Sequence, residues 1–288
     1  MHRGPEITSV FRLRRFFLCE WLAFGHNIND NPEMTSHLGD VCFDIYQYAF
    51  RAILLFEQTV MAHADAFDDG LDAYYRGDYP AAVNFWKLLA EQGDADAQNN
   101  LGLMYLAGEG VPQDYAEAMI WFCRAAEQGV PEAVNWLRAA AKHGVAAAQN
   151  YLGLMYANGR GVPQDYAEAA QWYRKSAEQD VAAAQNNLGA MYATGRGVPP
   201  DDAEAAKWFR QAADLGHFGA QTNLGLMYYI GKGVPQDLVQ AHMWFNIADA
   251  LGDESAQEER DEVAKRMTPD QIAEAQRMAR EWMAKHQQ

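Results

Sequence analysis

The sequence predicts an all-α fold, a right-handed superhelical solenoid of antiparallel helix pairs, and three observations support this prediction. A 17-residue segment, GLMYLAGEGVPQDYAEA in its first copy, occurs four times, at residues 102–118, 153–169, 189–205 and 225–241. The last three copies repeat at an interval of 36 residues. Each copy also has two stretches of helical apolar spacing around a Gly-Pro loop. Self-similarity at a fixed period of this length indicates a repeat array.

The first helix of each unit is AQNNLGLMY in its clearest copy. Ala97, Leu101, Gly102 and Tyr105 fall on one face at helical spacing, so this face should be buried. Gly102 has no side chain, which predicts a close approach of the partner helix. Gly108 follows where a left-handed residue would end the helix.

The second helix begins after an extended Val-Pro turn, because the residue before proline avoids the helical region. Asp114 should be its N-cap, and Glu117 lies three residues later, as in a capping box. The same pattern recurs as Asp165/Glu168, Asp201/Glu204 and Asp237/Gln240. The apolar stripe of this helix is expected at Ala118, Trp121, Phe122 and Ala125.

These motifs together resemble the Sel-one-like repeat, a relative of the tetratricopeptide repeat. The resemblance covers roughly residues 65–252. It implies an α-solenoid, and members of the family usually act as scaffolds or adaptors for protein partners. Fold-level analogy of this kind is a weaker guide to function than to structure.

The repeat pattern predicts the domain organisation. Residues 1–64 carry no repeat, and the five helix-pair units lie at 65–93, 94–129, 145–180, 181–216 and 217–252. The interval between Gly102 and Gly153 is 51 residues instead of 36, so an extra single helix is expected at 131–143. Residues 253–288 should form a C-terminal pair of capping helices, with Thr268 and Gln271 as a capping box.

Residues 49–64 have a partial secretory appearance. Arg51 is a short basic region, AILLF an apolar core, and Ala62-His63-Ala64 a small-residue cleavage site before Asp65. A start codon assigned too far upstream would explain why this segment is internal. The alternative is a helix, capped by Asp40, that leads into the solenoid. The first interpretation predicts a periplasmic or secreted protein and the second a cytoplasmic one.

The formal net charge of −16 argues against nucleic acid and against an anionic membrane surface as partners, because both select clusters of Lys and Arg. No apolar run approaches the ~20 residues that an integral membrane helix needs. The charge is also compatible with a basic protein partner. The sequence does not predict an oligomeric state.

The sequence contains no recognisable catalytic, cofactor or metal motif, so we expect a protein that is not an enzyme. None of the four serines lies in G-x-S-x-G or precedes Lys by three residues. The loop G-x-G continues into Val-Pro and follows no strand, which is not a dinucleotide site. No histidine pair or CxxC has zinc-ligand spacing, and His217 and His242 are interpreted as surface or half-buried residues.

The cysteines weigh against one alternative function, a cell-envelope hydrolase of the β-lactamase-like repeat type. Some related repeat proteins are linked to β-lactam hydrolysis and carry a disulfide in each unit. Cys123 is the only cysteine within the repeats, and it is interpreted as a buried small hydrophobe. The tryptophans of the second helices are interpreted as core residues, and they are Trp86, Trp121, Trp172, Trp208 and Trp244, with Trp136 in the same role in the extra helix.

The candidate binding surface is the stripe of the first helices that lies opposite the predicted buried face. In tetratricopeptide-like arrays this stripe lines the concave surface. Its mixture of amide, apolar and tyrosine side chains suits an extended peptide better than a phosphate. The alternative is that it buries a neighbouring helix or faces water. The stripe consists of Asn99, Leu103, Leu106, Asn150, Leu154, Ala157, Asn186, Ala190, Ala193, Thr222, Leu226 and Tyr229.

The sequence therefore predicts a scaffold that binds a protein or peptide on its concave face. Two other classes are weighed against it, the envelope hydrolase and a purely structural spacer. The loop tips Glu109, Arg160, Arg196 and Lys232 form a second variable row, which is expected to be solvated.

Overall fold

The computed structural model describes residue 61 and residues 63–286. The chain divides into two units, Met1–Asp65 and Ala66–Gln288, and the second contains the repeats. Most of the signal-like segment 49–64, including Arg51 and Ala62, and the proposed helix cap Asp40 lie outside the described residues. The secretory hypothesis therefore stays a prediction.

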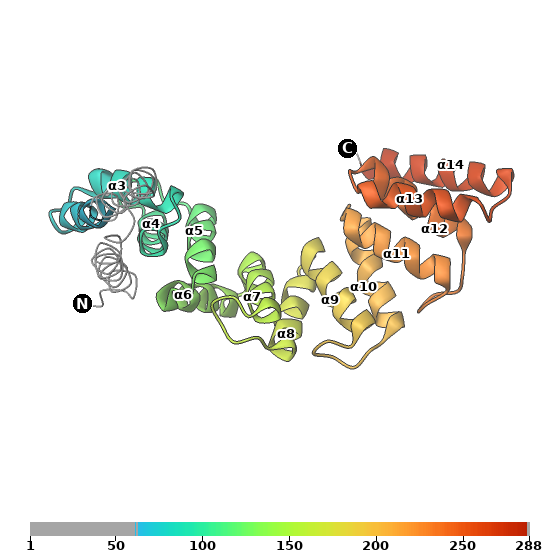
Figure 1. The fold of residues 1–288 in the computed structure, drawn as a ribbon, viewed down its shortest axis with the longest axis horizontal. Helices are drawn as coiled ribbons and strands as arrows, with labels where there is room; N and C mark the ends of the chain where they lie inside the picture. The colour runs from blue at the N-terminus through green and yellow to red at the C-terminus, as the bar shows by residue number, and fades with distance from the viewer. Residues whose placement is uncertain (1–60, 62, 287–288) are drawn as a thin grey trace, which may run out of the picture. The chain divides into compact units, whose positions relative to one another are not determined.

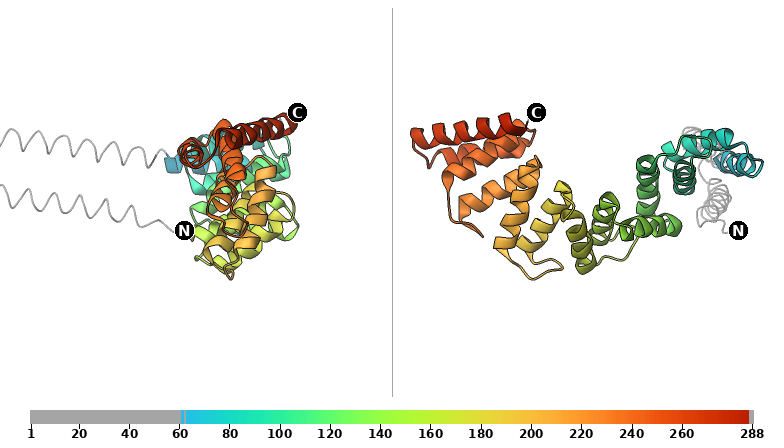
Figure 2. Two further views of the ribbon diagram at one scale, coloured as in Figure 1. Left: turned by 90° about the vertical axis from the view of Figure 1, so that its right-hand side faces the viewer. Right: turned by 180° about the vertical axis from the view of Figure 1, so that it is seen from behind.

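All regular elements of the described residues are helices (Figures 1 and 2). Residues 63–75 are helical, and helices α3 to α14 follow them along the chain. These helices are α3 (Tyr79–Glu91), α4 (Ala95–Ala107), α5 (Tyr115–Glu127), α6 (Pro131–Lys142), α7 (Ala146–Asn158), α8 (Tyr166–Ala177), α9 (Ala182–Thr194), α10 (Asp202–Asp214), α11 (Phe218–Ile230), α12 (Leu238–Ala250), α13 (Glu254–Ala264) and α14 (Pro269–His286).

Helices that are neighbours in sequence are also neighbours in space (Figure 1). The strongest packing joins the first and second helix of a unit, as in α4 with α5 and α7 with α8. α6 packs against α5 on one side and α7 on the other, and both α13 and α14 pack against α12. This pattern of consecutive helix pairs confirms the predicted solenoid class.

The first helix of each full unit ends at a glycine with left-handed backbone geometry, as predicted for Gly108. Its φ is 75°, and its N–H donates to the Met104 carbonyl. Gly159, Gly195 and Gly231 end their helices in the same way, with φ values of 69°, 69° and 72°. Only glycine adopts this conformation without steric cost, so these positions fix where each loop begins.

The second helices are capped by the predicted aspartates, but the capping box is one-sided. Asp114 Oδ1 accepts from the backbone N–H groups of Ala116 and Glu117 at 2.9 and 3.1 Å. The Asp114 N–H donates instead to the Tyr105 carbonyl at 3.0 Å, so it does not need the Glu117 side chain. At α14 the box is complete, because Thr268 N donates to Gln271 Oε1 and Gln271 N donates to Thr268 Oγ1.

The close approach predicted at the Leu-Gly glycine is confirmed. A Cβ added at Gly102 would lie 2.8 Å from the ring of Phe122, a side chain that is 2% exposed. The corresponding glycines Gly153, Gly189 and Gly225 meet the rings of Tyr173, Phe209 and Phe245 at 2.5, 2.9 and 2.9 Å. The absent side chain therefore provides the space for the aromatic ring of the second helix.

The buried face of the first helix differs from the prediction at one position. Ala97, Leu101 and Gly102 are buried as expected, but Tyr105 is only half-buried. Met104 takes the core position, with 1% exposure. The longer Tyr105 side chain lies at the boundary between two core clusters and packs partly against each.

The second-helix tryptophans are mainly core residues, and the extra helix is the exception. Trp86, Trp121, Trp172 and Trp244 are buried and Trp208 is half-buried. Trp136 was assigned the same role, but it is 40% exposed. Its ring stacks on Phe122 at 5.9 Å, and the adjacent Leu137 occupies the core instead. α6 comes directly after α5, which is itself the second helix of a unit. Trp136 therefore packs against α5, whereas its counterparts pack against a complete helix pair.

Candidate functional site

The predicted stripe is half-buried along most of its length. Asn99 is buried at 9% exposure and Leu226 is exposed at 42%. The other ten residues have intermediate exposure. Many of them also pack partly against a core cluster, as Leu103 and Leu106 do beside α5–α7 and as Leu154 and Ala157 do beside α8–α9. The stripe thus contributes to contacts between units as well as to the surface.

The polar members of the stripe divide into two kinds. Asn186 Oδ1 accepts from Asn223 Nδ2 at 3.1 Å, and Thr222 Oγ1 donates to Asp253 Oδ2 at 2.6 Å. These two side chains therefore bond within the fold. The side-chain oxygens of Asn99 and Asn150 are enclosed and meet no hydrogen-bond donor among the described residues. Tyr229 differs again, because Arg266 lies over its ring at 5.1 Å.

The loop glutamine of the GVPQD motif fixes the last turn of the stripe. Gln113 Nε2 donates to the Leu106 carbonyl at 2.9 Å, and Gln164 Nε2 donates to the Ala157 carbonyl at 2.7 Å. Gln236 repeats this bond to the Tyr229 carbonyl at 2.7 Å. The third copy has Pro200 in place of glutamine. The sequence showed that the glutamine recurs but not which group it binds.

The loop tips were expected to be solvated, and this prediction is wrong in part. Lys232 pairs with Asp202 at 2.9 Å, Arg160 pairs with Glu127 at 3.7 Å, and Arg196 lies over the ring of Tyr166. Glu109 raises the pKa of Tyr74, to which it is hydrogen-bonded. Arg160, Arg196 and Lys232 remain exposed and Glu109 is half-buried, and each tip reaches back to a preceding unit.

A buried glutamine links each first helix to the helix before it. Gln149 Nε2 donates to the Ala141 carbonyl at 3.0 Å, and its Oε1 accepts from Gln179 Nε2 at 2.7 Å. Gln98, Gln185 and Gln221 make the first of these bonds to Ala90, Ala177 and Ala213. Sequence reasoning missed these residues, although the invariant Gln of the AQ dipeptide in all four copies was the available signal.

Three titratable side chains have pKa values shifted by partial or full burial, the half-buried Cys123 and His217 and the buried His242. Burial raises the pKa of the Cys123 thiol to about 12, so almost no reactive thiolate exists at neutral pH. Burial lowers the pKa of both His217 and His242. His217 caps α11, since its Nδ1 accepts from Ala220 N at 3.1 Å. His242 is 3% exposed, so its assignment as a surface or half-buried residue was wrong.

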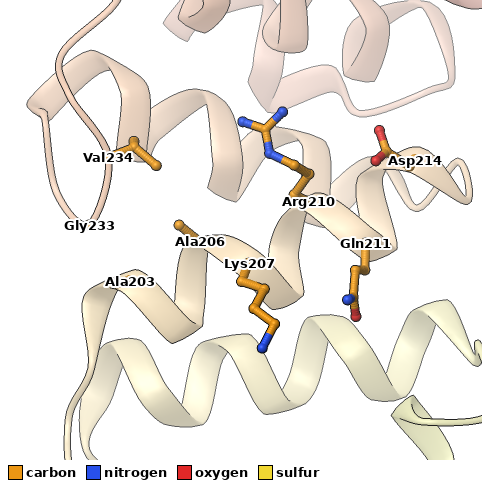
Figure 3. Close-up of a pocket in the computed structure, with 8 residues that line it drawn as sticks. All are labelled: Ala203, Ala206, Lys207, Arg210, Gln211, Asp214, Gly233 and Val234. Atoms are coloured by element: carbon orange, nitrogen blue, oxygen red, sulfur yellow. The ribbon is translucent and has the colours of Figure 1, made fainter.

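A surface hollow of about 380 Å³ lies between α10 and the loop before α12 (Figure 3). It is lined by Lys207 and Arg210 on α10 and by Gly233 and Val234 of the loop, with Asp214 at one end. Within the described part of the chain, no group of three metal-ligating side chains converges. None of the helices there is both long and apolar enough to cross a bilayer.

The fold and the repeated helix pairs define the class of protein, an α-solenoid whose accessible surface is built from many similar units. The Sel1 repeat model matches residues 60–94, 95–130, 131–145, 146–181, 182–217 and 219–253. The chain therefore belongs to the Sel1 repeat family. Proteins with this repeat are commonly protein-interaction scaffolds.

Solved structures provide further similarities, whereas no curated protein matches the chain. A protective antigen present in uropathogenic Escherichia coli strains, with an SLR fold, is 28% identical over 78% of this chain and 61% of its own, with a TM-score of 0.42. A Sel1 repeat protein from Oxalobacter formigenes is 32% identical over 65% of this chain and 71% of its own, with a TM-score of 0.41. Cysteine rich protein B of Helicobacter pylori is 23% identical over 51% of this chain and 94% of its own, with a TM-score of 0.35.

Proposed function

We propose that this protein is a scaffold that binds an extended peptide segment of a protein partner along the stripe of its first helices. The observation that carries the proposal is the accessibility of the stripe, whose members combine amide and apolar side chains and, apart from the buried Asn99, are half-buried or exposed.

The apolar members of the stripe support the same kind of ligand. Leu226 is 42% exposed, and Leu154 is half-buried one turn after Asn150. Alternating amide and apolar side chains match a peptide, which presents backbone N–H groups and side chains in turn. A hydrolase is the less favoured alternative, because the sequence has no recognisable catalytic motif and Cys123 is the only cysteine of the repeats, so they lack the disulfide in each unit.

The test is peptide selection followed by matched substitutions. Random dodecapeptides displayed on phage are selected on the full chain, and the affinities of those that bind are measured. Leu226→Gln on the stripe should weaken binding, because a central contact contributes about 2 kcal/mol or more. Ile120→Gln on α5 is the control, since Ile120 is similarly exposed, at 45%, but lies off the stripe.

Equal effects of these two substitutions would place the peptide elsewhere on the surface. Failure to select any peptide would contradict the proposal as a whole. Thermal melts of both variants should match that of the parent, because substitutions at exposed positions usually change stability by no more than about 0.5 kcal/mol.

A further inference from the structure

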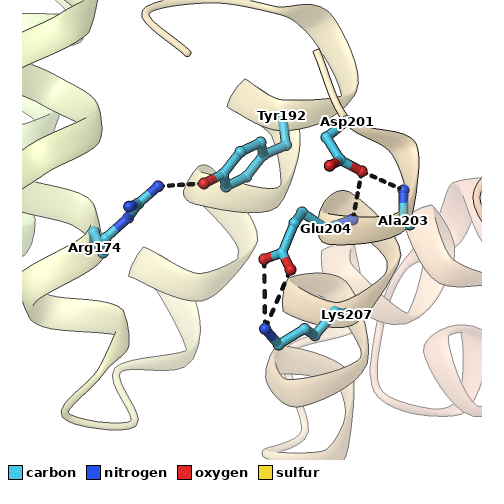
Figure 4. A network of polar contacts seen from close by, with 6 residues as sticks. All are labelled: Arg174, Tyr192, Asp201, Ala203, Glu204 and Lys207. Carbon is cyan, nitrogen blue, oxygen red and sulfur yellow. Dashed lines mark hydrogen bonds and ion pairs between the residues drawn. The ribbon is translucent and has the colours of Figure 1, made fainter. Parts of the chain in front are cut away.

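A regular row of arginines runs along the second helices at the centre of the array. Arg138, Arg174 and Arg210 occupy the same position of α6, α8 and α10, 36 residues apart. Each donates from its Nη2 to a tyrosine hydroxyl 18 residues later, on the first helix that follows, and the acceptors are Tyr156, Tyr192 and Tyr228. Figure 4 shows Arg174 of α8 extended toward Tyr192 of α9.

The positive charges of this row are not neutralised within the described residues. The chain has 39 acidic and 23 basic residues, so a cation has many potential partners. Some other cations of the array are paired, as Lys207 is with Glu204 at 3.3 Å and Lys232 is with Asp202 at 2.9 Å. No carboxylate of the described part forms an ion pair with any of the three arginines. Asp214 lies one turn beyond Arg210; burial raises the pKa of this carboxyl and the arginine lowers it by less, and the two form no ion pair.

The tyrosines hold the arginines in place without using up their hydrogen-bonding capacity. A guanidinium has five N–H donors, and the tyrosine hydroxyl accepts one of them. The guanidinium carbons of Arg174 and Arg210 lie 5.8 and 5.4 Å from the centres of their tyrosine rings. Immobilising these side chains before binding lowers the entropy cost of capturing a ligand. The remaining N–H groups can grip a carboxylate in bidentate fashion.

The surroundings of the row favour an anionic ligand. Lys175 adds a second cation beside Arg174 on α8, where its Nζ lies 4.3 Å from the centre of the Trp172 ring. Lys207 also lines the hollow next to Arg210, but it is already paired with Glu204 (Figure 3). The row ends at both sides, because the corresponding residues are Cys123 on α5 and Asn246 on α12. It is a cationic strip in an otherwise acidic protein.

We propose that this arginine row binds an acidic, extended peptide segment through its carboxylates. One first helix separates successive arginines, so they stand roughly 10–20 Å apart at ordinary helix packing distances. An extended peptide advances about 3.3 Å per residue, and a dodecapeptide therefore reaches along the whole row. The net charge of the protein repels such a peptide at a distance, but at physiological salt this repulsion is screened beyond about 8 Å. Close contacts are screened less.

The inference rests on the proposed function, peptide binding by the array, and adds a second surface and the charge of its ligand. The probe is a fluorescein-labelled (Glu-Ser)₆ peptide, titrated with the full chain at physiological salt, with (Gln-Ser)₆ as the neutral control. The triple substitution Arg138→Gln, Arg174→Gln and Arg210→Gln should weaken binding of (Glu-Ser)₆ at least tenfold. Ile120→Gln on α5, an exposed residue outside both the stripe and the arginine row, should leave it unchanged.

A second triple substitution separates local recognition from net charge. Lys265→Gln, Arg277→Gln and Lys285→Gln lower the net charge by the same three units at exposed positions on or next to α13 and α14. This variant should weaken binding less than twofold. Equal weakening by both triples, or no binding of (Glu-Ser)₆ to the parent protein, would overturn the arginine row. Binding of phage-selected peptides would in either case leave the proposed function standing.

Two further variants keep the test decisive if the arginine triple does not fold. Arg174 is exposed, so Arg174→Gln alone should fold and weaken the probe about threefold. Tyr192→Phe with Tyr228→Phe keeps every charge and ring but removes the hydroxyls that orient two arginines, and binding should fall severalfold. If the arginines only stabilise contacts between units, these variants will have a lower Tm but an unchanged affinity for the peptide. That outcome refutes the proposal.

Discussion

Replacement of Gly189 tests the argument that a missing side chain sets the distance between the two helices of a unit. A Cβ at this position would lie 2.9 Å from both Cδ1 and Cε1 of Phe209. Atoms of side chains essentially never come this close, so either the ring or the helix must shift. Phe209 is 4% exposed and belongs to the core shared by α10, α11, α12 and α14, which leaves the ring little room to move.

The expected magnitude follows from two opposing effects. Alanine in place of glycine stabilises a helix interior by roughly 0.5–1 kcal/mol. Overpacking a filled core costs about 1–3 kcal/mol. Gly189→Ala should therefore range from nearly neutral to about 2.5 kcal/mol less stable, whereas Gly189→Val lacks most of the compensating gain. For a domain of this size, a loss of 1–3 kcal/mol corresponds to a fall of roughly 2–12 °C in Tm.

The assay is thermal unfolding followed by circular dichroism, with Gly219→Ala as the matched control. Gly219 is also helical, but a Cβ there would approach nothing closer than the His217 ring, at 3.3 Å. This control should be neutral or slightly stabilised. Shortening the opposing ring with Phe209→Leu should recover part of the loss in Gly189→Val, since residues in contact do not act additively. An unchanged Tm for Gly189→Val, or no coupling to Phe209, would refute the packing argument.

Two further predictions concern buried polar groups. Gln149→Leu should destabilise the array by about 1 kcal/mol more than Gln221→Leu, because Gln149 Oε1 accepts a hydrogen bond from Gln179 whereas Gln221 Oε1 meets no donor among the described residues; equal losses in urea unfolding would contradict this. Burial lowers the pKa values of His217 and His242 below the ordinary 6.5, so the unfolded chain binds protons more readily and stability should fall as the pH drops below about 6.5. The Tm of His242→Leu should fall less than that of the parent between pH 7.5 and pH 5.5, and an identical fall would remove His242 from this account.

The fold was predictable because its main determinants are local and repeated. The left-handed glycines, the aspartate caps and the small residue opposite each aromatic ring all recur in phase, so each copy supports the interpretation of the others. Trp136 shows where this logic fails. Its sequence context matches that of the other tryptophans, but its exposure depends on which helix precedes it in space, and α6 follows a second helix instead of a first.

The candidate site was less predictable, because its polar contacts come from outside the repeated motif. Thr222 was placed on the stripe by its register, but Asp253, the N-cap of α13, accepts its hydroxyl hydrogen. Tyr229 similarly meets Arg266 from the segment after α13. The burial of the first-helix glutamines was not predicted, because a glutamine in a helix is usually expected at the surface. Their burial is explained only by the structure, in which each glutamine side chain donates to a backbone carbonyl of the preceding helix.

The extra helix α6 links the sequence irregularity to the arginine row. The same Gly-Val dipeptide stands before and after α6, as Gly129-Val130 and Gly144-Val145. The next unit therefore begins with its usual sequence, AAAQN. The loop after α7 reaches back to the end of α5, since a Cβ on its Gly161 would collide with the Ala126 carbonyl. In the two later loops the corresponding glycines meet the first turn of the preceding second helix. α6 is therefore accommodated without breaking the array, and its Arg138 supplies a third cation where α5 offers only Cys123. A half-unit inserted at this place thus lengthens the cationic strip by one position while the periodic packing resumes on either side.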